Sequence, residues 1–335
     1  MLYAIDALDT LSFGIGKPAV RGEDTFGIGM FPPFPSVVRG AFRTAWLSGH
    51  IECIGEMDTE ADPTKVWAIT GYALSLNGVP HFPAPADTVF IKEGEPLKSL
   101  ELRENDGLSS LSVPYQLWAG VDGRVSPPDK RYISLNTLRE YLRGGLNDIP
   151  SVPLSDYISS ESRIGIYRER ETRAAEDAML FRAPLTRTSG RSGRLEILVN
   201  IDGIDGVAER GLLRFGSHGK TASFRASGAQ IAPELGASEG NAFKIYLATP
   251  AIFQNGWYPE IPGAELMTAA VSGYDSVGGF DIKKGRPKPM RRAVRAGSVY
   301  YYKCAGNADE LFKLHGTSIS NERAEDGFGI CYIGR

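Results

Sequence analysis

Residues 72–87, "YALSLNGVPHFPAPAD", carry the strongest local fold signal in the sequence. The dipeptide Asn77-Gly78 favours the two-residue turns of β-hairpins, and mostly apolar residues flank it. The stretch therefore predicts a strand, a tight turn, a second strand and a proline-rich exit. A two-residue loop returns the chain beside itself, so the paired strands must be antiparallel.

A helix is predicted before this hairpin, in "MFPPFPSVVRGAFRTAWLSGH" (residues 30–50). Ser36 is expected to cap its first turn and Gly49 to end it. Arg39 and Arg43, spaced i and i+4, lie on a face away from the apolar stripe. A capped helix N-terminus suits phosphate, so we expect this end, with both arginines, to face RNA.

Further helices are predicted on either side of the hairpin. A short one is expected after Asp62, with Pro63 at its first position. Another is expected in "SLNTLREYLRGG" (134–145), beginning at Ser134 and ending at the glycine pair.

The second half of the chain is rich in strand-forming residues, as in "LEILVNIDG", "FKIYLATPAIF" and "GSVYYYK". Helices and hairpins occur without a regular strand-helix-strand rhythm, which favours an α+β fold with antiparallel sheets. A length of 335 residues favours two domains, predicted at residues 1–155 and 156–335. Trp257, in "FQNGWYPE", is expected to pack at a turn.

Composition argues for a globular protein without a membrane segment. The chain is 42% hydrophobic and 23% charged, with a formal net charge of -3. Neither a cationic leader nor a run of eighteen apolar residues occurs, so we expect a cytoplasmic protein. Cys53, Cys304 and Cys331 lack metal-ligand spacing, which predicts reduced thiols, no disulfide and no metal site.

The charge is segregated along the chain. In residues 278–303, "GGFDIKKGRPKPMRRAVRAGSVYYYK", seven cations fall within thirteen residues that contain no carboxylate. Pro287 and Pro289 predict an extended strap whose cations follow a single-stranded RNA backbone without pairing internally. Residues 51–62, "IECIGEMDTEAD", carry five acids and no cation; they are interpreted as solvated surface or as a contact for a partner protein.

Glycine loops with flanking cations are typical of phosphate binding, because glycine lets main-chain N–H groups approach closely. Examples are "SFGIGKPAVRGEDTFGIGMF", with Lys17 and Arg21, and "RFGSHGKTASFR", with Lys220. Eight arginines lie between Arg163 and Arg194, with aromatic residues among them. Arginines beside aromatics suit single-stranded RNA.

No catalytic constellation is evident in the sequence. The histidines are separated and lack metal-ligand spacing, and neither a Walker A loop nor a nucleophile elbow occurs. His218 and Lys220 are the best candidates for an acid–base pair acting on a ribose hydroxyl, although an exposed turn is the preferred interpretation of His218.

Several segments, taken in order, resemble one family, the third subunit of the Cmr module, which is a RAMP protein of type III-B CRISPR effector complexes. These segments are "LDTLSFGIGKPA", "FPPFPSVVRGAFR", "GYALSLNGVPHFPAPAD", "RIGIYRERETRAAEDAMLFRA", "YLATPAIFQNGWYPE", "VGGFDIKKGRPKPMRRAVRAGSVYYY" and the terminal "GFGICYIG". The resemblance runs from Leu8 to Gly334.

The resemblance implies two ferredoxin-like, RRM-like RAMP domains with β-hairpin insertions and glycine-rich loops. It also implies a non-catalytic subunit, without a cofactor, that holds the 5′ tag of the CRISPR RNA. The implied protein partners are the large palm-domain subunit and the neighbouring backbone RAMP subunit. Gly327, Gly329 and Gly334 correspond to a shortened version of the family's glycine-rich loop.

The predicted RNA-binding residues are cations and one helix-capping serine. They are Lys17, Arg21, Ser36, Arg39, Arg43, Arg163, Arg168, Arg170, Lys220, Lys283, Lys284, Arg286, Lys288, Arg291 and Arg292. Three alternatives remain open: an endoribonuclease that processes CRISPR precursor RNA, with His218 and Lys220 in its site; the type III-A tag-binding counterpart; and a module that binds any polyanion.

Overall fold

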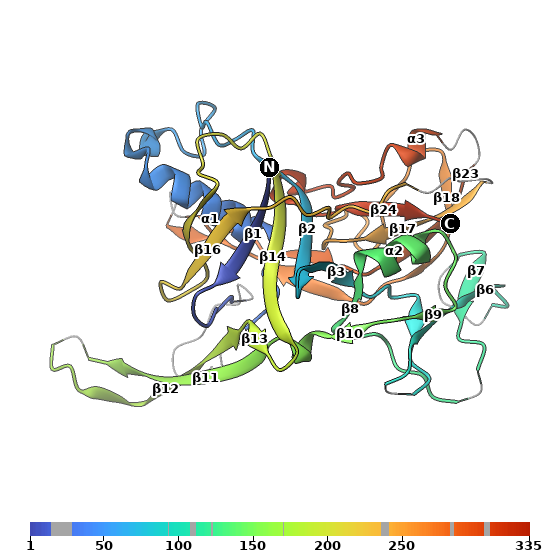
Figure 1. Cartoon of the computed structure of the whole chain (residues 1–335), viewed down its shortest axis with the longest axis horizontal. Coiled ribbons are helices and arrows are strands. Elements are labelled where there is room, and N and C mark those ends of the chain that lie inside the picture. Colours follow the sequence, from blue (N-terminus) through green and yellow to red (C-terminus); the bar gives the residue numbers. More distant parts are fainter. Residues whose placement is uncertain are drawn as a thin grey trace.

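The computed structural model describes residues 1–14, 29–92, 94–107, 112–121, 123–169, 171–235, 241–281, 285–304 and 309–335. Within these ranges antiparallel strands predominate and helices are few, so the α+β prediction is confirmed (Figure 1).

A large antiparallel sheet forms one part of the molecule. In order across the sheet its strands are β10 (Val152–Pro153), β8 (Arg131–Ser134), β3 (Val79–Pro83), β2 (Ala68–Leu76), β14 (Gly193–Asp202), β1 (Leu2–Ala7), β16 (Thr221–Ala226) and β15 (Arg210–Arg214), and β13 (Ser189–Gly190) pairs with β14. The first strand, β1, lies between two late ones, because Ile5 pairs with both Ile197 and Phe224.

This sheet does not end at the predicted domain boundary. Strands β14, β15 and β16 come after residue 155, yet β14 pairs with both β1 and β2. The large sheet therefore takes its strands from residues 2–226, and the next sheet takes its strands from residues 242–334. The large sheet therefore spans the predicted boundary at 155/156, and the division into two domains stays a prediction.

The hairpin expected around Asn77-Gly78 is present as β2–β3. Asn77 and Gly78 both have positive φ, 52° and 85°, as a type I′ turn requires. Leu76 pairs with Val79 directly across the turn. The prediction from residues 72–87 is therefore confirmed.

Helix α1 (Pro35–Ser48) covers one face of the large sheet (Figure 1). The buried ring of Phe42 lies 4.8 Å from that of Tyr3 on β1 and 5.1 Å from that of Phe224 on β16. The predicted cap is wrong: the N-cap residue is Phe34, and it makes no side-chain capping bond. Pro35 takes the first helical position, where its fixed φ suits the helix, so Ser36 lies inside the first turn.

Helix α2 (Leu135–Leu142) confirms its prediction. The Ser134 hydroxyl accepts a hydrogen bond from the Thr137 N–H at 3.2 Å and so caps the helix. The apolar side of the helix is buried and contacts β3 and β8 of the large sheet and β24 (Cys331–Gly334) of the small sheet.

The short helix expected after Asp62 is absent from the described residues, which form turns there and enter β2 at Ala68. The Asp62 carboxylate accepts hydrogen bonds from the Thr64 N–H at 2.8 Å and from the Thr64 hydroxyl at 2.7 Å. This local bonding offers the backbone a turn in place of a helix.

A second, smaller sheet lies beside the large one. Its strands, in order, are β18 (Ala264–Ala270), β23 (Val299–Cys304), β17 (Ala242–Leu247) and β24. Along β17, Tyr246 packs into the core of the large sheet, whereas Ile245 and Leu247 pack into a separate core on the opposite face. Trp257 packs against that second core, which confirms the expectation for it.

The remaining elements are the two long strands β11 and β12 and a set of short helices and strands. They are η1 (Ile51–Gly55), β4 (Thr88–Val89), β5 (Leu97–Ser99), β6 (Glu101–Glu104), β7 (Tyr115–Trp118), β9 (Asp148–Ile149), η2 (Leu154–Asp156), β11 (Ser159–Arg168), β12 (Ala175–Arg187), β19 (Tyr274–Val277), β20 (Phe280–Asp281), β21 (Arg286–Pro287), β22 (Arg291–Val294), α3 (Asp309–Phe312) and η3 (Ala324–Asp326). None of the helices in the described ranges is long and apolar enough to cross a membrane.

A buried polar cluster joins helix α2 and the small sheet to the turn that follows β3. The Asp87 carboxylate, which follows β3, accepts hydrogen bonds from the Tyr141 hydroxyl of α2 at 2.7 Å and from the Tyr301 hydroxyl of β23 at 2.5 Å. Lys244 of β17 places its ammonium 3.6 Å from the centre of the Tyr141 ring. Helix α2 and the small sheet therefore meet at the Asp87 carboxylate through Tyr141 and Tyr301.

Candidate nucleic-acid interface

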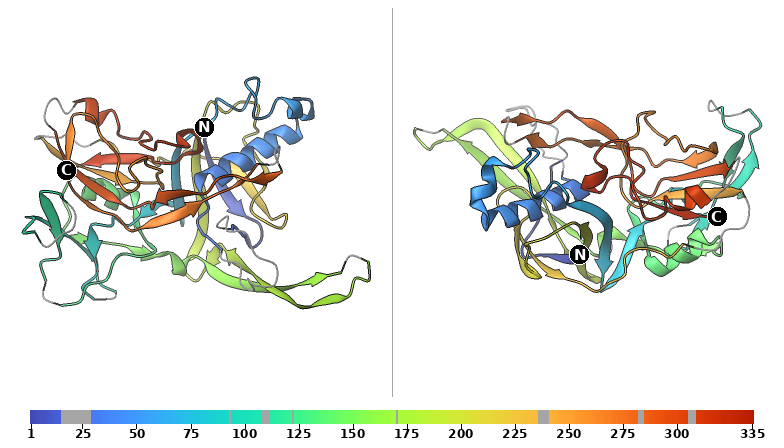
Figure 2. Two further views of the ribbon diagram at one scale, coloured as in Figure 1. Left: turned by 180° about the vertical axis from the view of Figure 1, so that it is seen from behind. Right: turned by 90° about the horizontal axis from the view of Figure 1, so that it is seen from above.

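Strands β11 and β12 form a long two-stranded hairpin that projects from the molecule (Figures 1 and 2). Its base is fixed to the start of the chain, because Leu11 and Thr186 exchange backbone hydrogen bonds of 2.7 and 2.8 Å. A two-stranded ribbon has no further layer against which to bury its side chains. Among its described side chains, Ile164 and Ile166 are exposed, whereas Leu185 near the base is buried.

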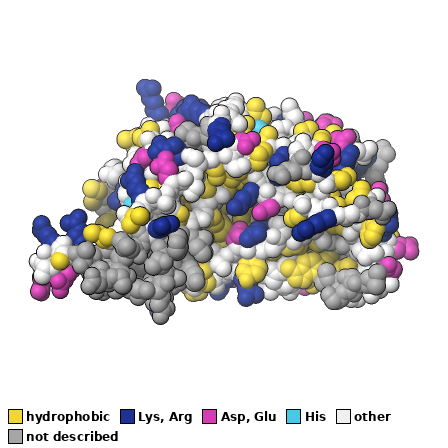
Figure 3. Space-filling model, turned by 90° about the horizontal axis from the view of Figure 1, so that it is seen from below, with side chains coloured by type: hydrophobic (Ala, Val, Ile, Leu, Met, Phe, Trp, Pro, Cys, Tyr) yellow, Lys and Arg dark blue, Asp and Glu magenta, His cyan; other side chains and the backbone are white. Residues whose placement is uncertain are grey.

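The predicted residues Arg163 and Arg168 lie on this hairpin and are exposed. Two isoleucines between them are also exposed, Ile164 at 66% and Ile166 at 48%. Figure 3 views the molecule from the side of the hairpin and shows Lys and Arg side chains at its free end and spaced across the rest of that face. Exposed cations beside exposed apolar side chains match what a single-stranded nucleic acid offers, phosphates and base faces.

An ion pair closes the base of the hairpin. The Arg187 guanidinium donates to the Glu161 carboxylate at 2.5 Å. This hydrogen bond lowers the pKa of Glu161 and raises the pKa of Arg187. Both groups are therefore charged at neutral pH, and Arg187 is held at the mouth of the neighbouring cleft.

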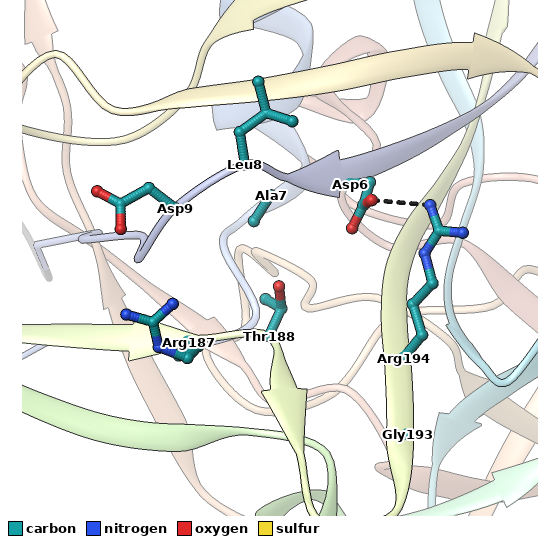
Figure 4. Close-up of a pocket in the computed structure, with 8 residues that line it drawn as sticks. All are labelled: Asp6, Ala7, Leu8, Asp9, Arg187, Thr188, Gly193 and Arg194. Atoms are coloured by element: carbon teal, nitrogen blue, oxygen red, sulfur yellow. Dashed lines mark hydrogen bonds and ion pairs between the residues drawn. The ribbon is translucent and has the colours of Figure 1, made fainter.

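A cleft of about 470 Å³ opens where the hairpin meets β1 and β14 (Figure 4). Its lining comes from three separate segments of the chain: Asp6, Ala7, Leu8, Asp9, Arg187, Thr188, Gly193 and Arg194. Asp9 and Arg187 lie on one side of it, whereas Asp6 and Arg194 lie on the other. The Asp6 carboxylate and the Arg194 guanidinium form an ion pair at 2.7 Å.

The cleft offers both kinds of hydrogen-bonding partner. Guanidinium groups donate to phosphate or to base acceptors, whereas ionised carboxylates accept from base amino groups. Asp9 stays ionised over a wide pH range, because a hydrogen bond from Lys220 lowers its pKa to about 2. The cleft therefore presents side chains of the chemistry that a phosphate and a base edge require.

Lys220, one of the predicted RNA-binding residues, makes its polar contacts with other residues of this chain. Its ammonium donates to the Asp9 carboxylate at 2.6 Å and to the Thr10 hydroxyl at 3.0 Å, and its side chain is only 10% exposed. His218 lies at an exposed turn with a φ of 60°, as preferred from the sequence. Lys220 fixes one end of the cleft through Asp9.

Arg39 and Arg43 on α1 are also engaged internally. Arg39 donates to the Trp67 carbonyl at 2.9 Å and to the Asp326 carboxylate at 3.1 Å. Arg43 donates to the Thr64 hydroxyl at 2.7 Å and to the Asp62 carboxylate at 2.5 Å. These contacts give both arginines a structural role; that they also bind RNA stays a prediction.

The extended cationic strap expected in residues 278–303 is folded into two short antiparallel ladders. β19 pairs with β22, and β20 pairs with β21, so that Pro287 lies opposite Phe280. The expectation that its cations lack internal partners is also wrong. Arg291 pairs with Glu322 at 2.8 Å, and the Arg292 guanidinium lies 4.9 Å from the centre of the Tyr274 ring.

The two ladders belong to one segment, residues 274–294, which we call the second hairpin. Arg286 and Lys288 are exposed on it. Other predicted residues lie outside the described ranges: Lys17, Arg21, Arg170, Lys283 and Lys284.

The terminal glycines are explained by close packing. A Cβ on Gly327 would come within 2.6 Å of Ile69 of β2, and one on Gly329 within 2.5 Å of the Ser320 N atom. A Cβ on Gly334 would lie 2.6 Å from the Leu142 carbonyl at the end of α2. These glycines let the C-terminal segment approach the large sheet and α2 closely.

Sequence reasoning did not single out the lining of the cleft. Arg187 and Arg194 belong to the arginine-rich run between Arg163 and Arg194, so a compositional signal existed for them. For Asp6 and Asp9 no local signal pointed to a site, because their position depends on pairing with strands from the middle of the chain.

Comparison with known proteins places this fold in a family. Among solved structures, a chain of a type III-B Cmr-beta complex bound to cognate target RNA is similar at 17% sequence identity and a TM-score of 0.53, covering 90% of this chain and 86% of that chain. A chain of a type III-B Cmr-beta complex bound to cognate target RNA and AMPPnP, in state 1, is similar at 15% identity and a TM-score of 0.50, with coverage of 90% and 86%. No curated protein sequence matches the chain.

The structural similarity, at these identities, concerns the fold alone. The sequence itself matches a family model, described as CRISPR-associated protein (Cas_Cmr3), over residues 3–335. That match runs from the first strand to the last residue, through the projecting hairpin and both sheets, so the chain belongs to the Cas_Cmr3 family of CRISPR-associated proteins.

Proposed function

We propose that the chain is an RNA-binding subunit of a type III CRISPR effector complex and that it holds the 5′ tag of the CRISPR RNA. Membership of the Cas_Cmr3 family supports a role in such a complex. Similar folds occur in Cmr-beta complexes bound to target RNA, which supports RNA and other subunits as partners. The protein partners we propose are the large palm-domain subunit and the neighbouring backbone RAMP subunit.

The observation that carries this proposal is the cleft at the base of the projecting hairpin. Arg187 and Arg194 line it together with Asp6 and Asp9, and exposed Arg163 and Arg168 continue outward along β11. A single strand can run along the hairpin with its phosphates on the arginines while one nucleotide enters the cleft. We further propose that the chain comprises two RAMP domains of ferredoxin-like type, as the family resemblance implies.

A binding role is favoured over catalysis. In the alternative nuclease, Lys220 would exchange protons with the RNA, but its ammonium is held by Asp9 and Thr10. Phosphate contacts need only a fixed positive charge, which an internally paired, partly exposed arginine still supplies. We therefore propose that any chemistry of the complex belongs to neighbouring subunits.

The test measures RNA affinity of the purified chain for a tag-bearing RNA and for a single strand of unrelated sequence. The variant Arg163→Ala/Arg168→Ala removes two exposed cations from the hairpin, and neither takes part in an ion pair among the residues that the structure describes. We expect at least tenfold weaker binding to the tag-bearing RNA, with unchanged thermal unfolding. Arg103→Ala/Arg143→Ala is the matched control, since both arginines are about half exposed and lie elsewhere.

Equal losses in the hairpin and control variants would contradict the proposal and favour non-specific polyanion binding. Incubating the chain with repeat-containing RNA without metal tests the nuclease alternative in the same preparation. Discrete cleavage that disappears in His218→Ala would overturn the binding-only role.

A further inference from the structure

An exposed apolar surface lies just beyond the C-terminal end of α1. Three large aliphatic side chains are exposed there, Ile51 at 67%, Ile54 at 65% and Val66 at 71%. Ile51 and Ile54 both lie on η1, and side chains three residues apart eclipse on a 3₁₀ helix, so these two form a single ridge. We call residues 51–66 the acidic knob.

The charge of the acidic knob is negative. Its carboxylates are Glu52, Glu56, Asp58, Glu60 and Asp62. Arg43 is shared between Asp58 and Asp62, and Lys65 pairs with Glu60. Among the described residues, Glu52 and Glu56 take part in no ion pair, and both are exposed beside the isoleucine ridge.

The helix below adds to this negative potential. The backbone dipole of α1 places partial negative charge at its C-terminal end, and the last turn contains no basic residue to offset it. A nucleic acid backbone would be repelled from such a surface. A basic protein surface would be attracted to it.

The acidic knob is held in one conformation before any partner arrives. Asp62 is almost fully buried and accepts hydrogen bonds from the Asp58 N–H, the Thr64 N–H and the Arg43 guanidinium. Burial opposes its ionisation, but these hydrogen bonds and the charge of Arg43 together keep the pKa of Asp62 below its usual range. A surface that is ordered in advance loses less entropy on binding.

We propose that the acidic knob is a docking surface for a protein subunit that presents an apolar groove flanked by lysine or arginine side chains. The isoleucine ridge enters the groove, and Glu52 and Glu56 meet the flanking cations. Figures 1 and 2 show α1 and η1 well apart from the free end of the β11–β12 hairpin, so a protein can bind here while RNA occupies the hairpin. The choice of the large subunit, the backbone subunit and tag-bearing RNA as binding partners in the test rests on the proposed function.

The test uses Ile51→Ser/Ile54→Ser, with Ile164→Ser/Ile166→Ser as the matched control. Both pairs are exposed isoleucines, one on the acidic knob and the other on the hairpin. Affinity for the purified large subunit and for the purified backbone subunit is measured separately, together with affinity for tag-bearing RNA. We expect the knob variant to bind one of the two subunits at least tenfold more weakly and RNA unchanged, and the control to bind both subunits unchanged.

Charge reversal provides a second variant that leaves the apolar ridge intact. Glu52→Lys/Glu56→Lys should weaken binding of the same subunit and reduce the salt dependence of its association rate. A photoreactive amino acid at position 54 should cross-link to a protein subunit in the reconstituted complex, whereas one at position 164 should cross-link to RNA.

Failure of this inference differs from failure of the proposed function. Unchanged affinity for both subunits in the knob variants overturns the docking surface, while RNA affinity still reports on the hairpin. A cross-link from position 54 to RNA overturns it as well. So does self-association of the wild-type chain that the knob variant abolishes, because the occupant would then be a second copy.

Discussion

Burial of Lys244 makes the stability of the fold depend on pH. Burial lowers its pKa from 10.5 to about 8, although the charge of Asp87 acts in the opposite direction. The unfolded chain therefore binds the Lys244 proton more tightly than the folded chain does. Below about pH 8, where the lysine is protonated in both states, the difference in proton affinity lowers the free energy of unfolding. This cost disappears as the pH rises toward 10.5.

Lys244→Met, which removes the charge and keeps an unbranched side chain, should remove this pH dependence. Between pH 7.5 and 9.5 the stability of the wild type should rise by about 2 kcal/mol relative to the variant. Urea unfolding at both pH values measures the difference, and tyrosine ionisation largely cancels because both proteins contain the same tyrosines. Parallel stability curves would show that Lys244 keeps an ordinary pKa in the folded chain.

At the scale of elements, the salt dependence of RNA affinity can show whether the second hairpin contacts phosphates. If Arg291 and Arg292 contact phosphates, Arg291→Ala/Arg292→Ala should reduce the slope of log K against log salt by about 1.4 for single strands. Affinity should fall alike for tag-bearing and unrelated strands, because phosphate contacts carry little base information.

Glu322→Gln is the companion variant, since it keeps Arg291 and removes its ionic partner. Freed from Glu322, Arg291 should raise the affinity for single strands. A wild-type salt slope in the double arginine variant would assign both residues to folding or to a protein contact.

The elements that could be predicted from the sequence are those with local signals. The Asn77-Gly78 turn and the Ser134 cap were predictable because the bonds that form them lie within a few residues. The helix expected after Asp62 was wrong because a competing local pattern forms there: the Asp62 carboxylate accepts from the Thr64 N–H and hydroxyl, which favours a turn. The extended strap with unpaired cations was wrong because residues 286–294 pair with residues 274–281 and Arg291 pairs with Glu322.

In the candidate site, too, only the part with a sequence signal could be predicted. The arginine-rich run indicated the hairpin, where Arg163 and Arg168 are exposed as expected. The cleft could not be predicted, because Asp6 reaches Arg194 only through the pairing of β1 with β14. Charge alone also could not show which cations have internal partners, as Lys220 illustrates.

At the scale of the whole molecule, the Asp87 cluster holds α2 against the small sheet. Asp87→Asn removes the charge that accepts hydrogen bonds from Tyr141 and Tyr301 and leaves a buried amide donor facing them. The free energy of unfolding should fall by about 1–3 kcal/mol. Amide hydrogen exchange should accelerate together in α2 and β23, which the cluster joins.

Asp148→Asn is the control, because Asp148 is an exposed member of an ion pair with Lys98. Surface pairs of this kind contribute about 0–1 kcal/mol. Exchange that accelerates in α2 but not in β23 would mean that the cluster stabilises the helix without coupling it to the small sheet.

The position of β1 between β14 and β16 has a consequence for synthesis on the ribosome. The first strand leaves the exit tunnel early, but its neighbours lie at Gly193–Asp202 and Thr221–Ala226. At a translation rate of about 5–20 residues per second, β1 waits on the order of ten to forty seconds for a partner. During that interval its backbone is an open edge able to pair with another nascent chain. We therefore expect β1 to stay without its sheet partners until residues 193–226 have been translated.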